Sequence, residues 1–94
     1  MVTLGQRLRE LREKRGLTVR QFAERIMKTP GYVSRIEARG EIPSPELLCE
    51  IANVYRVSPK ELLDLAKQCY LERTERELEA KNSSALALYR REKK

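Results

Sequence analysis

Apolar residues recur every three or four positions in five successive segments of this chain, which is the spacing that buries one face of a helix. Each segment follows a polar residue that can cap a helix, with Gln or Glu three positions later or Pro at the first helical position. The pattern therefore predicts an all-α protein with helices over residues 4–15, 19–26, 30–37 and 45–55, and a fifth helix that begins at residue 59.

The last third of the chain predicts a helical tail. No glycine or proline follows residue 65, so the fifth helix can continue toward residue 80, and residues 82–84 can cap one more short helix. We expect a five-helix domain over residues 1–65 and a tail over residues 66–94. The tail presents more apolar side chains than a solitary helix usually exposes: Cys69, Tyr70, Leu78, Leu86, Leu88 and Tyr89.

The positive charge is concentrated near the N-terminus. Residues 1–40 contain ten Lys or Arg against four Asp or Glu, whereas residues 41–94 contain ten of each, so the first 40 residues carry the whole net charge of +6. A basic surface binds polyanions because neutralising phosphates releases condensed counterions. Charge alone leaves a solubilising surface as the alternative.

Composition argues against other classes of function. The chain has no His, no Gly-rich phosphate loop and no nucleophile motif, and its 94 residues leave little room for a deep cleft, so we expect neither an enzyme nor a cofactor. Cys49 and Cys69 lack the spacing of a zinc site, and we expect buried free thiols in a reducing compartment. No segment is typical of a membrane span or a signal peptide. We expect a cytoplasmic protein.

The second and third predicted helices are short, closely linked and followed by further packing helices. Such a pair suits the major groove of DNA, which is about 12 Å wide and admits one helix. From residue 4 to about residue 65 the sequence resembles the phage-repressor-like (Xre/Cro-type) helix-turn-helix family. The resemblance rests on Leu17-Thr18, Phe22-Ala23, Ile26, Thr29, Tyr32 to Glu37, Pro43-Ser44, Leu48, Ile51-Ala52 and Val57-Ser58.

The resemblance implies a lambda-repressor-like domain that binds a specific sequence of double-stranded DNA and regulates transcription, more often as a repressor. Helix 30–37 would read bases in the major groove, and Arg35 is the strongest candidate because a guanidinium can donate two parallel hydrogen bonds to guanine O6 and N7. A phosphate contact or a surface ion pair is the alternative for Arg35, and Tyr32 could instead cover the core. The base-reading candidates are Thr29, Pro30, Gly31, Tyr32, Ser34 and Arg35.

Other positions have different expected roles. Val19 and Met27 depart from the family, which often has Gln at the first position for a DNA contact and Gly at the second for a left-handed turn. The family pattern pairs the positions of Arg12 and Glu37, so the resemblance implies a partly buried structural ion pair between them. The phosphate-contact candidates, each of which could also be solvated charge or, for Thr18, a helix cap, are Arg9, Thr18, Arg20, Lys28 and Arg39.

Two partner arrangements remain open. A homodimer formed through the tail would place two recognition helices about 34 Å apart, one DNA turn, and would favour a nearly palindromic operator. The alternative is a protein-interaction module with the same fold, such as an antitoxin or a coactivator, whose tail binds a protein partner.

Overall fold

The computed structural model describes residues 2–81, which form helices and connecting loops without a strand. The all-α expectation is confirmed for this part of the chain, and the expected caps and apolar residues beyond residue 81 lie outside it. The helices are α1 (Leu4–Lys14), α2 (Val19–Arg25), α3 (Pro30–Arg39), α4 (Pro45–Tyr55) and α5 (Pro59–Lys81).

The helix starts use the caps that the sequence predicts. Thr3 and Thr18 each form a capping box with the glutamine three residues later, and Thr29 and Ser44 each precede a proline at the first helical position. All four hydroxyls accept a backbone N–H at 3.1 or 3.2 Å. These bonds satisfy amides that a helix leaves unpaired at its N-terminus.

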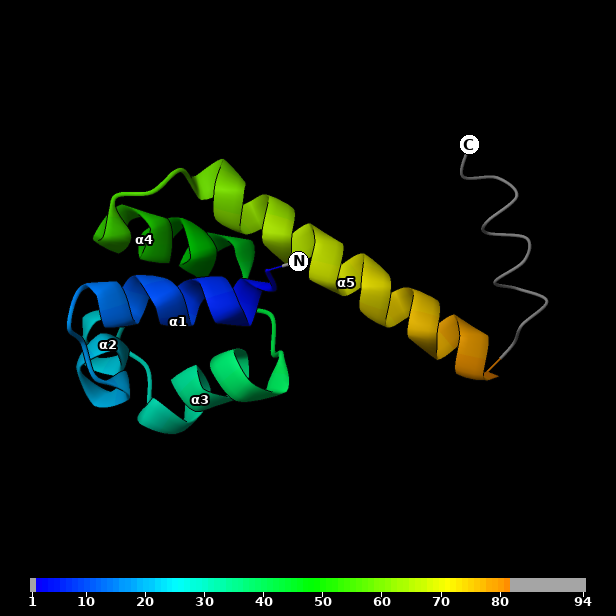
Figure 1. Cartoon of the computed structure of the whole chain (residues 1–94), viewed down its shortest axis with the longest axis horizontal. Coiled ribbons are helices and arrows are strands. Elements are labelled where there is room, and N and C mark those ends of the chain that lie inside the picture. Colours follow the sequence, from blue (N-terminus) through cyan, green and yellow to red (C-terminus); the bar gives the residue numbers. More distant parts are fainter. Residues whose placement is uncertain (1, 82–94) are drawn as a thin grey trace.

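One apolar core joins all five helices. The ring of Phe22 from α2 stacks on Tyr55 from α4, with ring centroids 5.1 Å apart, and α1 lies between α3 and α4 in Figure 1. At Gly5, α1 approaches α3 so closely that an added Cβ would lie 2.6 Å from the Ile36 carbonyl oxygen. The fully buried side chains include Leu4, Leu8, Phe22, Val33, Ile36, Leu48, Ile51, Tyr55 and Leu62.

The expected burial of both cysteines is wrong for Cys49, whose side chain is exposed, while Cys69 is half-buried against the core. Cys49 lies on α4 just outside the buried stripe formed by Leu47, Leu48, Ile51 and its neighbours. Helical spacing places it beside apolar residues in sequence but not on the same face.

The fifth helix continues well past the core. Ala66 is the last fully buried residue of α5, Cys69 still packs against the core, and Arg73 donates to the Gly40 carbonyl. Figure 1 shows the end of α5 projecting away from the other four helices. Residues 59–81 form one continuous helix across residue 65, where the sequence suggested a division into domain and tail. Within residues 2–81, no helix combines the length and apolar character that crossing a bilayer requires.

Candidate nucleic-acid interface

Helices α2 and α3 are joined by a tight turn. Ile26 caps the C-terminus of α2, and Met27 then takes a left-handed backbone conformation with φ 57. The Lys28 N–H donates to the Ala23 carbonyl at 2.9 Å, and Thr29 caps α3. The buried Val33 and Ile36 hold the inner face of α3 against the core, which leaves its other face directed to solvent.

The outer face of α3 is exposed and built largely from small residues. Gly31, Ser34, Arg35, Ala38 and Arg39 line one shallow depression on the surface, and all five are exposed. Positions three, four and seven apart lie on the same side of a helix. An added Cβ at Gly31 would come no nearer than 3.8 Å to another group, so its lack of a side chain is not required by packing. The face can approach a flat or grooved partner closely.

Arg35 is restrained on this face by two contacts. Its Nε donates to the Glu41 carboxylate at 3.2 Å, with 47% and 39% of the two side chains exposed. The guanidinium carbon also lies 5.6 Å from the centre of the Tyr32 ring. Within the described residues, this arrangement leaves the terminal nitrogens Nη1 and Nη2 without a hydrogen-bond partner.

Tyr32 contacts both the apolar core and the cations at the surface of α3. Its ring is half-buried against the core, while the Lys28 ammonium lies 5.4 Å from the ring centre. Desolvation raises the pKa of the Tyr32 hydroxyl, the Glu41 carboxylate raises it further, and Arg35 opposes the shift. The ring therefore serves as a fixed apolar platform beneath two cations.

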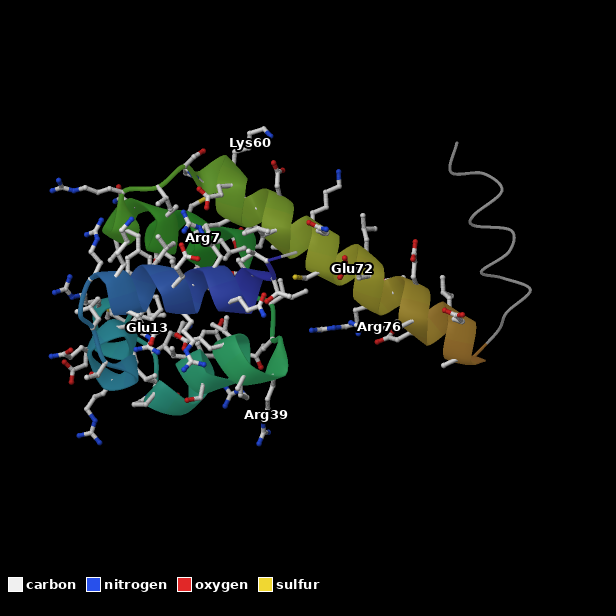
Figure 2. The ribbon with its side chains drawn as sticks, in the orientation of Figure 1. Arg7, Glu13, Arg39, Lys60, Glu72 and Arg76 are labelled. Carbon is white, nitrogen blue, oxygen red and sulfur yellow. The ribbon has the colours of Figure 1, made fainter. Side chains whose placement is uncertain are left out.

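The expected phosphate contacts are all exposed and come from different elements of the chain. Arg20 lies on α2, Lys28 in the turn and Arg39 at the end of α3, where Figure 2 shows it projecting away from the ribbon. Arg9 comes from α1 and pairs with Glu13 at 3.4 Å. The Thr18 hydroxyl is engaged in its capping box. Val19, where the family often has Gln, packs against the core instead.

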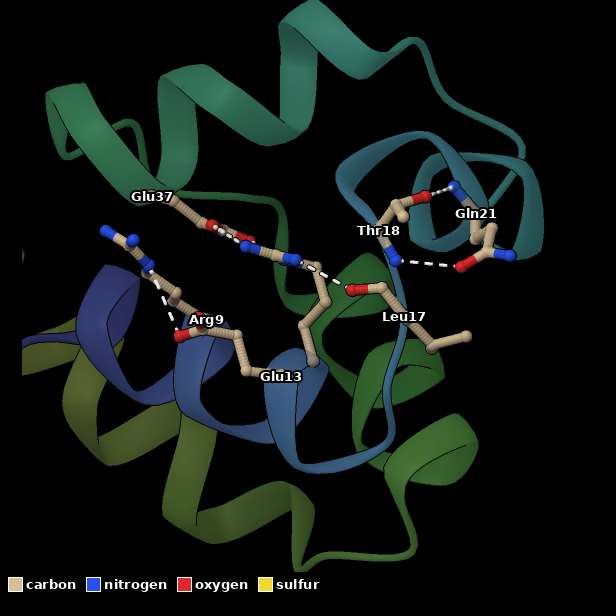
Figure 3. A network of polar contacts seen from close by, with 7 residues as sticks. Arg9, Glu13, Leu17, Thr18, Gln21 and Glu37 are labelled. Atoms are coloured by element: carbon tan, nitrogen blue, oxygen red, sulfur yellow. Dashed lines mark hydrogen bonds and ion pairs between the residues drawn. The ribbon is translucent and has the colours of Figure 1, made fainter.

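Arg12 and Glu37 form a bidentate ion pair between α1 and α3. Nε lies 2.9 Å from Oε2 and Nη2 lies 3.1 Å from Oε1, with only 11% and 8% of the side chains exposed. The third nitrogen of Arg12 donates to the Leu17 carbonyl at 2.7 Å, and Figure 3 shows both acceptors. The hydrogen bond to Glu37 raises the pKa of Arg12. The pair ties α1 to α3 and to the start of α2.

Sequence reasoning missed two contacts. Glu41 lies between the predicted helices 30–37 and 45–55 and was not among the candidate site residues, yet it accepts a hydrogen bond from Arg35. The available signal was Gly40, because a glycine can reverse the chain after a helix. Arg15 donates to the Tyr55 carbonyl at 2.7 Å, placing a cation at the C-terminus of α4, where the helix dipole favours it.

The fold and this surface define a helix-turn-helix protein, in which α2 supports an α3 whose outer face is free. A family model described as "Helix-turn-helix" matches residues 8–62. The chain belongs to this Xre/Cro-type helix-turn-helix family, and the expected fold class is confirmed.

Two solved structures of the clp gene regulator ClgR from Corynebacterium glutamicum are similar to this chain. One is 34% identical with a TM-score of 0.56, over 69% of this chain and 84% of that one. The other is 31% identical with a TM-score of 0.58, over 82% of this chain and 83% of that one. A comparison with curated proteins gives no significant match.

Proposed function

We propose that this DNA-binding transcriptional regulator is a repressor that recognises a specific duplex sequence with α3 in the major groove. Its family and its similarity to ClgR support DNA binding and transcriptional regulation. The observation that carries the more specific proposal is the exposed outer face of α3, where Gly31, Ser34 and Ala38 leave room for close approach beside Arg35. A helix with such a face can enter the groove deeply enough to meet base edges.

Arg35 is the main base-reading residue in this proposal. Its unpaired terminal nitrogens can donate to O6 and N7 of one guanine. The Tyr32 ring and the Ser34 hydroxyl contribute nearby contacts, while residues 29–31 approach the groove without long side chains. Part of the specificity then comes from DNA shape and deformability, which proteins read without base contacts.

The backbone contacts come from the exposed groups around α3. Arg20, Lys28 and Arg39 bind phosphates from α2, the turn and the end of α3, and Arg9 and Thr18 bind at the margin. Each such contact adds affinity for any sequence and weakens with salt. Together they position α3 in the groove while Arg35 reads the sequence.

The active form in this proposal is a homodimer that contacts itself through α5 beyond the core. Tyr70 is 62% exposed on this part of the helix, and aromatic side chains are enriched at protein interfaces relative to the rest of the surface. Two copies related by a two-fold axis would bind two half-sites. In this proposal, residues 1–65 bind DNA and the tail from residue 66 makes the dimer contact.

Selection from a random duplex library tests the proposal. At about 150 mM salt, where sequence-independent attraction is partly screened, we expect enrichment of inverted half-sites about 10 base pairs apart. The selected site, placed over a reporter promoter, should lower expression when the protein is present. Absence of any enriched sequence would contradict specific recognition, and raised expression would contradict repression.

A further inference from the structure

Glu41, the second residue after the end of α3, is joined to Arg35 twice. The Glu41 backbone N–H donates to the Arg35 carbonyl at 3.1 Å, and its side chain accepts from Arg35 Nε at 3.2 Å. Gly40 makes this possible because its left-handed conformation, with φ 74, turns the chain back over the end of α3. Glu41 is therefore fixed beside Arg35 by the backbone as well as by charge.

Helix α5 secures the same turn from the other side. The Arg73 guanidinium donates to the Gly40 carbonyl, so the peptide that precedes Glu41 is held by α5 while the Glu41 amide is held by α3. An anchored backbone limits the positions that the Glu41 carboxylate can take. This contact links the long fifth helix to the end of the recognition helix.

The bond to Glu41 uses the one Arg35 nitrogen that end-on recognition of guanine does not need. A guanidinium has five N–H groups in one plane, and engaging Nε leaves the terminal pair, Nη1 and Nη2, to donate in parallel to O6 and N7. The Tyr32 ring limits motion of the same group from its face, 5.6 Å from the guanidinium carbon. Restraining a flexible side chain before binding reduces the entropy lost on binding.

We propose that Glu41 is a positioning residue for base recognition, which holds Arg35 through Nε so that its two terminal nitrogens meet one guanine; this inference rests on the proposed function. Glu41 does not touch DNA in this arrangement. It improves discrimination between bases, while its negative charge reduces attraction to phosphates of any sequence.

The inference predicts that removing the Glu41 carboxylate raises the affinity for random DNA and lowers the preference for guanine at the base that Arg35 reads. Fluorescence anisotropy at about 150 mM salt would compare the selected operator, the same duplex with the guanine read by Arg35 changed to adenine, and a random duplex. For Glu41→Ala we expect tighter binding to random DNA but at least a fivefold loss of guanine-over-adenine preference. Glu41→Gln keeps an oxygen acceptor for Nε and should retain most of the preference.

Controls separate positioning from charge and from folding. Glu24→Ala removes an exposed acid from α2 and should leave the base preference unchanged. Because the Arg35 and Glu41 side chains are 47% and 39% exposed, the pair contributes little to stability, and Glu41→Ala should melt within a few degrees of the wild type. An unchanged base preference in Glu41→Ala, or an equal loss in Glu41→Gln, would overturn the positioning role. A wild-type protein with no preference among the three duplexes would overturn the proposed function, and this inference with it.

Discussion

Arg35 and Arg39 lie four residues apart on the exposed face of α3, yet their surroundings differ. Arg35 is held by Glu41 and by the Tyr32 ring, whereas Arg39 projects from the last turn of the helix toward solvent (Figure 2). A restrained guanidinium can impose geometry on one base, while a mobile one serves mainly as a charge. The two residues should therefore affect DNA binding in different ways.

Alanine substitutions should reveal this difference. Arg35→Ala should relax the preference at one base pair, by about 1–3 kcal/mol. Arg39→Ala should weaken binding to all sequences alike and reduce the slope of log affinity against log salt by about one. Titrations of operator and random duplexes at several salt concentrations measure both effects, and equal losses on both duplexes for Arg35→Ala would exclude a base-reading role.

Met27 stores backbone strain in the turn between α2 and α3. It has φ 57 and is 90% exposed. Packing of its side chain therefore contributes little stability to offset the backbone strain. Met27→Gly should raise the free energy of unfolding by about 0.5–1 kcal/mol, because glycine adopts this conformation without the Cβ clash. Met27→Ala keeps the clash and is the matched control. Urea unfolding that gives the glycine variant no advantage over the alanine variant would contradict the strain argument.

At the scale of whole elements, the ion pair of Arg12 and Glu37 holds the helix-turn-helix against α1. Arg12 also donates to the Leu17 carbonyl just before α2, so one side chain contacts three segments. The pair is mostly shielded from water, and an unpaired charge left there is costly. Residues with no DNA contact can thus control DNA binding through the position of α3.

Removing Arg12 alone should therefore be worse than removing the pair. Arg12→Ala should lower the free energy of unfolding by about 3 kcal/mol, the lower end of the range for buried pairs because both side chains keep some exposure. The double variant Arg12→Met/Glu37→Leu should be more stable than this and should regain operator binding. A double variant that is stable but binds DNA no better than Arg12→Ala would contradict a purely structural role and would indicate that the pair takes part in DNA binding.

The sequence predicts where helices begin better than where they end. Capping residues mark the starts of helices reliably, and the span predicted for α4 matches the structure. The end of α3 was predicted at residue 37, where the apolar pattern stops, but the helix continues to Arg39 because the left-handed Gly40 terminates it. The last turn of α3 is therefore set by backbone conformation and not by burial.

The site was less predictable than the fold because it depends on contacts between elements. Helical spacing and the family resemblance indicated the exposed residues of α3, but no periodicity links Arg35 to Glu41 across the turn at Gly40. The close approach of α1 to α3 at Gly5 cannot be predicted from the neighbouring sequence either. Such contacts depend on where the chain returns in three dimensions.

At the scale of the whole molecule, the excess of positive charge and the exposed Tyr70 lie on different parts of the chain. The basic excess belongs to residues 1–40, which contain α1, α2 and α3. Helix α5 extends away from these helices and carries Tyr70 (Figure 1). In the proposed dimer, this separation lets one end of the molecule bind DNA while the other contacts the second copy.

Substitution of the exposed tyrosine tests the dimer. Tyr70→Ala should weaken self-association at least tenfold, since large aromatic side chains often dominate interfaces, and should reduce affinity for paired half-sites more than for a single half-site. Glu79→Ala, also exposed on α5, is the control and should change neither. Light scattering across a range of concentrations measures the mass, and an unchanged dimer in Tyr70→Ala would place the interface elsewhere.

Recognition of guanine by Arg35 in the major groove is most directly tested by methylation interference on the selected operator. Dimethyl sulfate modifies guanine N7 in the major groove and adenine N3 in the minor groove, two atoms that report the two grooves separately. We predict that methylation of one guanine N7 in each half-site blocks the wild type but has little further effect on Arg35→Ala. Interference only at adenine N3, or the same guanine pattern in both proteins, would contradict the account.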